Sequence, residues 1–362
     1  MSGMSAAAYA AKAKLDSSFR SRGIAIALTS GCTYGIYTAF MTLAMSKGVW
    51  ADWYGANTAG LSAFALIYLL GALGAAVTDT SSAVWAVGIA TARGRIGDFF
   101  RTLKTKPGKV MVVGALFGGP IASTAYVIGL QMAGSIIVPI SALCPAFGAI
   151  LAKFIFKQPL TPRILLGIAI CFGASFMIAQ SSLGGDAPEG MALGLVFGFI
   201  AALGWGFEGS VCGYGTSMID SEVAITIRQV TSGLSNLIIL VPIFGLMAGD
   251  GMTASMVYQA FTSSAMFWFA IAGFFAYLNF MLWYKGNGMC GAALGMSCNG
   301  AFSFWGPFFC WIILGAVFGI DGWEMQPIAW FAALLMVFGI LVIAMNPMDL
   351  IKKKEMPIYE AA

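Results

Sequence analysis

The sequence predicts an all-α membrane protein in which ten transmembrane helices form two inverted five-helix repeats. Three observations predict it: the overall composition, the length of the apolar stretches, and the distribution of lysine and arginine. Of the 362 residues, 59% are hydrophobic and 9% are charged, whereas about 25% of the residues of an ordinary soluble domain are charged. A soluble protein with so few charges could not cover its surface, so the composition favours a chain embedded in lipid.

Ten apolar stretches approach or exceed the length that a bilayer requires. The hydrocarbon core is about 30 Å thick, so a spanning helix needs about 20 predominantly apolar residues. The stretch from Val110 to Ala152 carries no charge and is too long for one crossing, so we expect a hairpin at Gln131–Ser135. The expected spans are Gly23–Ser46, Gly55–Thr78, Val110–Leu130, Ser135–Phe156, Pro162–Gln180, Met191–Gly215, Val223–Ala248, Ser264–Tyr284, Met289–Val317 and Pro327–Met345.

The segment after Thr78 permits two interpretations. Polar residues from Asp79 to Ser82 are followed by the apolar stretch Ala83–Ala92, which is too short to cross a bilayer. We expect an interfacial helix that leads into a cytoplasmic loop. The alternative is a second span that extends toward Ala90 and buries Asp79.

Lysine and arginine predict the orientation, because loops on the cytoplasmic side are enriched in both. With the N-terminus inside, 17 of the 19 basic residues fall in cytoplasmic segments, Arg228 lies near the cytoplasmic end of its span, and Lys47 lies outside. The bias predicts a multi-pass protein of the cell membrane with an even number of spans and both termini in the cytoplasm. Residues 1–22 then form a cytoplasmic tail rather than a secretory signal, and residues 348–362 form a basic cytoplasmic tail.

A short internal similarity predicts the duplication. Tyr34-Gly35-Ile36-Tyr37 in the first span aligns with Trp205-Gly206-Phe207-Glu208 in the sixth. Because five spans precede the sixth, the second half must insert in the opposite orientation, as in many secondary transporters. The expected repeats are residues 23–182 and 190–347.

The order of several motifs resembles a known family. The first half contains, in this order, Tyr34-Gly35, Leu130-Gln131-Met132-Ala133-Gly134-Ser135, Pro145, Gln158-Pro159-Leu160, Gly167 and Gly173. The second half contains Gly204-Trp205-Gly206, Arg228 and Gly339. Together they resemble the EamA-like branch of the drug/metabolite transporter superfamily, over roughly residues 23 to 346. The resemblance implies a ten-helix transporter of a small metabolite, with a cavity lined by spans one, three, four, six, eight and nine.

Glu208 is the leading candidate for a functional residue. An ionisable side chain at the bilayer centre costs about 2.5–3.5 kcal/mol on insertion scales, so such residues are functional candidates. Glu208 lies 17 residues past Met191, or about 26 Å along a helix, in the cytoplasmic half of its span. Either it faces a cavity and binds a cationic group or a coupling proton, or it forms a structural pair with Arg228 or Lys285.

The expected solute-binding set adds aromatic and amide side chains to this acid. It consists of Glu208, Trp205, Tyr34, Tyr37, Asn279 and Asn299. The aromatic faces and the single acid suit a cationic or zwitterionic solute, because a ring face attracts ammonium groups, and an amino acid, an amine or a polyol would fit. The alternative for the aromatic residues is packing, and for the two amides it is a hydrogen bond between helices.

Other classes of function lack their characteristic residues. The chain has no histidine, no pair of carboxylates at helical spacing within a span, and no glycine-rich nucleotide loop. We therefore expect neither an enzyme, nor an ATP-driven pump, nor a cofactor or metal site. No basic block is interleaved with aromatic residues, which argues against nucleic acid. The expected partners are a small solute, the lipid bilayer and a coupling proton or cation; a channel, a sensory membrane protein and, less favoured, a membrane-embedded enzyme are the alternatives.

Overall fold

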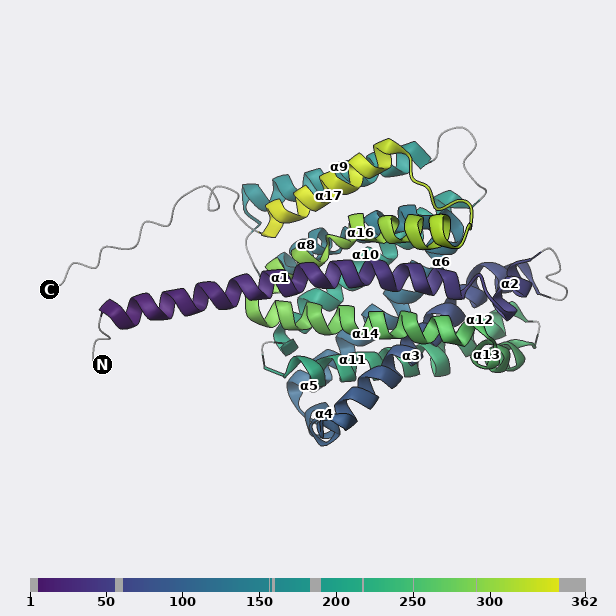
Figure 1. The fold of residues 1–362 in the computed structure, drawn as a ribbon, viewed down its shortest axis with the longest axis horizontal. Coiled ribbons are helices and arrows are strands. Elements are labelled where there is room, and N and C mark those ends of the chain that lie inside the picture. Colours follow the sequence, from purple (N-terminus) through teal and green to yellow (C-terminus); the bar gives the residue numbers. More distant parts are fainter. Residues whose placement is uncertain are drawn as a thin grey trace.

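The computed structural model describes residues 6–55, 61–155, 157, 160–182, 190–216, 218–249, 251–290 and 292–344. Within these ranges every regular element is a helix and no strand occurs (Figure 1). In the described part of the chain, seven helical runs are long and apolar enough to cross a membrane, namely Ser18–Ala44, Ala65–Ala92, Lys106–Ser141, Met191–Gly213, Ser221–Ala248, Ala265–Cys290 and Leu294–Val317. Two shorter apolar helices are Pro162–Met177 and Pro327–Ile343. The regular structure of the described residues is thus all helical, with the long apolar helices typical of a membrane protein.

The elements follow one another as a nearly continuous series of helices. Those of the first half are α1 (Ala6–Ala44), α2 (Val49–Tyr54), η1 (Ala65–Leu69), α3 (Leu70–Ala92), α4 (Ile96–Leu103), α5 (Lys106–Leu116), η2 (Phe117–Ser123), α6 (Thr124–Ala133), η3 (Gly134–Ile136), α7 (Ile137–Ser141), α8 (Cys144–Ile155) and α9 (Pro162–Ser182). Those of the second half are α10 (Met191–Thr216), α11 (Ser221–Ser235), η4 (Asn236–Leu240), α12 (Val241–Ala248), α13 (Thr253–Thr262), α14 (Ala265–Cys290), α15 (Ala292–Asn299), α16 (Phe302–Cys310), η5 (Trp311–Val317) and α17 (Pro327–Ala344). The N-terminal part of α1 projects from the bundle, and α17 ends at the end of the bundle from which α1 projects (Figure 1).

The helix α3 corrects the expected end of the second span. It continues without a break through Thr78 and Asp79 to Ala92, and Asp79 is buried. The expected separate interfacial helix is therefore wrong, and the alternative, one longer apolar helix that buries Asp79, agrees with the structure. The hydroxyl groups of Thr78 and Ser81 donate to carbonyl groups one turn earlier in the same helix. These bonds satisfy the hydroxyl groups of Thr78 and Ser81, and Asp79 finds its partners on α11 and η4.

The long apolar run from α5 to α8 is interrupted where the hairpin is expected. The helix α6 ends at Ala133, and Gly134 follows with a φ of 64°, a backbone conformation that favours glycine. In Figure 1, α6 lies toward the end of the bundle that holds α2, whereas α5 and α8 lie toward the opposite end. The predicted turn at Gln131–Ser135 coincides with this interruption.

Two glycines of the predicted repeat motif allow close helix packing. A Cβ atom on Gly35 would lie 2.5 Å from the carbonyl oxygen of Trp305 in α16. One on Gly206 would lie 2.9 Å from the carbonyl oxygen of Cys144 in α8. Small residues at such crossings let helix backbones approach closely, so Gly35 and Gly206 serve to pack α1 against α16 and α10 against α8.

Alanine substitutions at glycines are expected to differ in their effect on stability according to these contacts. Gly35→Ala and Gly206→Ala should each lower the free energy of unfolding by about 1–3 kcal/mol, because the new methyl group meets backbone atoms that cannot rotate away. Gly88→Ala, also within a long apolar helix, is the matched control, since a Cβ there meets nothing within 4 Å. Thermal unfolding of the purified variants measures the difference. A Gly35→Ala protein as stable as the Gly88→Ala protein would contradict the packing.

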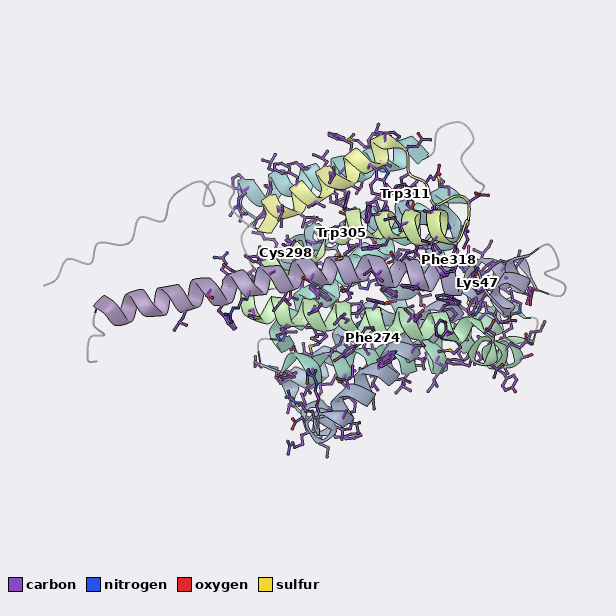
Figure 2. The ribbon with its side chains drawn as sticks, viewed as in Figure 1. Lys47, Phe274, Cys298, Trp305, Trp311 and Phe318 are labelled. Carbon is purple, nitrogen blue, oxygen red and sulfur yellow. The ribbon has the colours of Figure 1, made fainter. Side chains whose placement is uncertain are left out.

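The two ends of the bundle carry different charged contacts. At the end that holds α2, the Lys47 ammonium lies 5.2 Å from the centre of the Phe318 ring, and Figure 2 shows the two side chains together. Toward the opposite end, Arg93 pairs with Glu222, and Arg95 lies 3.0 Å from Asp220. These pairs join the segment after α3 to the start of α11. Because they are partly exposed, each contributes little to stability.

Candidate solute and charge site

Five aromatic rings form a buried cluster, called here the aromatic cluster. It consists of Tyr34 and Tyr37 from α1, Tyr126 from α6, Trp205 from α10 and Phe302 from α16. The Tyr34 ring is stacked on Phe302 at 4.2 Å between centroids, and it meets Trp205 edge-on at 5.8 Å. Trp205 also lies 5.1 Å from Tyr126. Three residues of the predicted solute-binding set, Tyr34, Tyr37 and Trp205, therefore come together from helices far apart in sequence.

Two side chains of this cluster, Tyr126 and Trp205, are hydrogen-bonded at their polar atoms. The hydroxyl groups of Tyr126 and Thr38 lie 2.7 Å apart, and Trp205 Nε1 donates to the carbonyl oxygen of Gly118 at 3.1 Å. Buried tyrosine and tryptophan usually find such partners, because an unpaired donor in an apolar region is costly. The bonds fix the orientation of Tyr126 and Trp205.

Next to the rings lies a second group, called here the charge cluster, formed by Asp79 of α3, Glu208 of α10 and Arg228 of α11. The three side chains are 2%, 0% and 0% exposed. Arg228 Nε donates to Glu208 Oε1 at 2.9 Å. The structural pair left open by the sequence is therefore formed with Arg228, whereas Lys285 is exposed.

Neighbouring side chains hold Arg228 and Glu208 in place. The Tyr284 hydroxyl lies 3.0 Å from Glu208 Oε1, and Arg228 Nη1 donates to Gln229 Oε1 at 2.8 Å. The guanidinium carbon of Arg228 lies 3.6 Å from the centre of the Phe280 ring, a geometry in which the ring face attracts the cation. Arg228 is thus bound by a carboxylate, an amide and an aromatic face.

Asp79 belongs to the charge cluster although it was absent from the predicted solute-binding set. Its Oδ2 atom accepts hydrogen bonds from Ser232 Oγ and from Asn236 Nδ2, the latter at 2.9 Å. The Arg228 guanidinium interacts electrostatically with both Asp79 and Glu208. The sequence pattern that could have identified Asp79 is an acid directly after a long apolar stretch. Because the predicted span ended at Thr78, Asp79 was placed outside the membrane and was not considered as a site residue.

Two polar atoms of the charge cluster lack a hydrogen-bond partner among the described residues. They are Glu208 Oε2 and Arg228 Nη2. Gly118 and Gly119 lie against Glu208 and Ser232, respectively, and both glycines belong to the π-helical segment η2. Such wide helical turns occur frequently at functional sites. The cluster therefore combines unsatisfied buried polar atoms with locally irregular helix geometry.

The two asparagines of the predicted set are bonded to each other. Asn299 Nδ2 lies 2.7 Å from Ser30 Oγ and 3.1 Å from Asn279 Oδ1, which links α15, α1 and α14. This is the helix-to-helix arrangement that the sequence left open. Ser30 lies one turn before Tyr34, so the amides adjoin the aromatic cluster.

A cavity of about 370 Å³ begins one helical turn beyond the aromatic cluster. Met41, one turn after Tyr37, and Leu130, one turn after Tyr126, lie in its wall, which also contains Tyr54 of α2. Gln131 contributes an amide whose nitrogen and oxygen are both buried without a partner among the described residues. Small-molecule sites are typically apolar concavities with a few placed polar groups, and this cavity has that character.

Comparison with known proteins finds limited similarity. No family model matches the chain. Protein LicB of Haemophilus influenzae is 26% identical over 126 residues, which span 34% of this chain and 42% of LicB. The matched segment thus covers less than half of that relative. One solved structure, described only as "Crystal structure of protein", covers 87% of this chain and 94% of its own, with 18% identity and a TM-score of 0.49.

Proposed function

We propose that this protein is a secondary transporter of the drug/metabolite type, which carries a small polar organic solute across the cell membrane by alternating access. The observation that carries the proposal is the buried aromatic cluster, which lies beside the charge cluster and one helical turn from a cavity of about 370 Å³. Aromatic and ionisable groups gathered inside a bundle of apolar helices mark solute and ion pathways in membrane proteins.

The helix series supports ten crossings. Seven runs have sufficient length and apolarity, and two shorter apolar helices stand beside them. The interruption at Gly134 divides the longest of these runs, Lys106–Ser141, whose last segment continues into α8. An even number of crossings agrees with α1 beginning and α17 ending at one end of the bundle (Figure 1), and the lysine and arginine bias favours the cytoplasm for that end.

Helix packing supports two equivalent halves. The proposed repeat pairs α1 with α10, α3 with α11, α5–α6 with α14, α7–α8 with α15–α16, and α9 with α17. Under this exchange the contact of α1 with α14 becomes the contact of α10 with α5–α6, and both are among the most extensive in the bundle. The helices α3 and α11 are equivalent to each other, as are α9 and α17, so exchanging the halves leaves the contact within each pair unchanged. Both contacts are also extensive.

Two glycines, Gly35 and Gly206, make contacts that agree with the proposed equivalence of the two halves. Gly35 and Gly206 occupy the same position in the aligned motif. Gly35 meets the backbone of α16, and Gly206 meets the backbone of α8, which are equivalent helices under the proposed exchange. The contact between Tyr34 and Trp205, also equivalent in the motif, fits a two-fold axis passing between them. Inverted-repeat transporters hold their solute at such an interface.

The chemistry of the site favours a cationic or zwitterionic solute. Several aromatic faces lie beside a group with two acids and one base, and ring faces attract ammonium groups most strongly when water is excluded. An amino acid, an amine or a polyol-like solute fits the proposal, and Glu208, Trp205, Tyr34, Tyr37, Asn279 and Asn299 remain the proposed contacts.

A panel of such solutes, scored by the thermal shift of the purified protein, tests this function. A solute that binds only the folded state at about 100 times its Kd adds about 2.7 kcal/mol to the stability. Solutes that raise the unfolding temperature should then show counterflow in proteoliposomes, which a carrier produces and a channel does not. If no cation or zwitterion in the panel shifts the unfolding temperature, the proposed solute class is wrong.

Glu208→Gln is expected to separate binding from folding. The variant should insert and purify normally, because Arg228 keeps its contacts with Gln229 and Phe280. Its affinity for a cationic solute should fall at least about tenfold, since a hydrogen bond to a charged group contributes about 1.5–3 kcal/mol. Glu324→Gln, at an exposed acid, is the control and should behave as the native protein. Unchanged counterflow by Glu208→Gln would remove Glu208 from the site.

A further inference from the structure

The formal charges of the charge cluster do not cancel when all three side chains are ionised. It contains two acids, Asp79 and Glu208, and one base, Arg228, and each side chain is at most 2% exposed. If all three were ionised, the cluster would carry one net negative charge in the interior of the bundle. A buried charge without compensation is strongly unfavourable, and a buried acid ordinarily avoids it by binding a proton.

The hydrogen bonds show that Asp79 is the acid without a directly bonded positive charge. Arg228 Nε binds Glu208 directly, whereas the donors to Asp79 Oδ2 are the neutral side chains of Ser232 and Asn236. Arg228 nevertheless interacts electrostatically with both acids. Its Nη2 atom and Glu208 Oε2 have no partner among the described residues, so the arrangement leaves one donor and one acceptor unused.

Among the residues that the structure describes, no cation other than Arg228 acts on the two acids. Besides Arg228, the titratable groups that interact electrostatically with the two acids come from four elements: Tyr37 of α1, Cys144 of α8, Cys212 of α10 and Tyr284 of α14. Phenols and thiols are neutral when protonated and become negative when they ionise. A proton on one of the two acids therefore restores neutrality with the groups present.

We propose that Asp79, Arg228 and Glu208 together bind one exchangeable proton, which the two acids share. With the proton on Asp79, Arg228 pairs with Glu208, as in the structure. With the proton on Glu208, the unused Nη2 atom of Arg228 is available to pair with Asp79. The proton enters from water on one side of the membrane and leaves to water on the other, so no other reactant is needed. Coupling of this proton to a solute rests on the proposed function, but its binding to the cluster does not.

Infrared spectroscopy of the purified protein in an ester-free detergent tests the inference, because protonated and ionised carboxyl groups absorb separately. At neutral pH the native protein should show one protonated buried carboxyl per chain, and its band should shift in deuterated water. Asp79→Asn and Glu208→Gln should each abolish that band, since either change leaves a neutral pair with Arg228. Asp321→Asn, at an exposed acid, is the control and should retain one band.

Three outcomes would overturn the inference. If the band survives in Glu208→Gln, or survives in Asp79→Asn, the proton belongs to one acid and is not shared. If the native protein shows no protonated carboxyl but is stabilised by sodium chloride and not by N-methylglucamine chloride, the compensating charge is a metal cation. Size-exclusion chromatography shows that each variant is folded. None of these measurements needs a solute, so a negative solute panel would reject the proposed function and leave the proton site standing.

Discussion

Arg228→Met is expected to lower the free energy of unfolding by about 3–5 kcal/mol, the cost of removing one partner of a buried ion pair. Methionine keeps an unbranched apolar stem but is shorter and uncharged, so the change removes the positive charge together with the contacts of the guanidinium with Gln229 and Phe280. Glu208 and Asp79 would then lie close together, both buried, with no base between them. Thermal unfolding in detergent and the yield of folded protein measure the effect.

A double substitution distinguishes charge from packing in this result. Glu208→Gln combined with Arg228→Met removes one acid together with the base, so the double variant should be more stable than Arg228→Met alone. Arg95→Met, at a partly exposed arginine, is the matched control and should change stability by less than about 1 kcal/mol. If Arg228→Met unfolds at the native temperature, Arg228 does not balance the acids. If the double variant gains nothing over the single one, the loss is due to packing.

Trp205→Ala is the second substitution with a large expected effect, because replacing a buried tryptophan by alanine typically costs about 3–5 kcal/mol. The change removes ring contacts with Tyr34 and Tyr126 and leaves the Gly118 carbonyl without the donor Nε1 of Trp205. The loss comes from packing and hydrogen bonding, since lipid is as apolar as the protein interior. The unfolding temperature should fall, and any solute-induced thermal shift should disappear.

Trp311→Ala is the control for this experiment. Trp311 belongs to η5 and is 43% exposed, so its removal opens no enclosed cavity and should cost much less. Trp205→Phe adds a second comparison, because phenylalanine keeps a ring beside Tyr34 but cannot donate to Gly118. If Trp205→Ala is as stable as Trp311→Ala and retains its thermal shift, the aromatic cluster contributes neither to packing nor to binding.

Hydropathy predicted the helices well where apolar runs had no charge. The turn near Gly134 and the glycines at Gly35 and Gly206 were predictable, because a bilayer limits the length of a span and close helix crossings require small residues. The same reasoning failed at Asp79, where a charge was taken as the end of a span. Its partners Ser232 and Asn236 lie more than 150 residues later in the chain, and no local pattern reveals such a pairing.

The candidate site was predictable only in part, for the same reason. The short motif alignment identified Tyr34, Tyr37, Trp205 and Glu208, and the structure places the three rings in one cluster with Glu208 beside it. Which base neutralises Glu208 depended on the packing of α10 against α11, so the sequence left Arg228 and Lys285 as alternatives. The Gly118 contact with Glu208 also depends on tertiary packing, because η2 is far from α10 in sequence.

The proposed transport function depends most on the inversion of the two halves, and cysteine accessibility tests this inversion directly. Ala51 follows the first span and Met218 follows the sixth, and both residues are exposed. In intact cells, a membrane-impermeant thiol reagent should label Ala51→Cys but not Met218→Cys, and inside-out vesicles should reverse the result, with the native protein as the background. Labelling of both positions from the same side would mean that the halves are parallel and would contradict the shared, alternately accessible site.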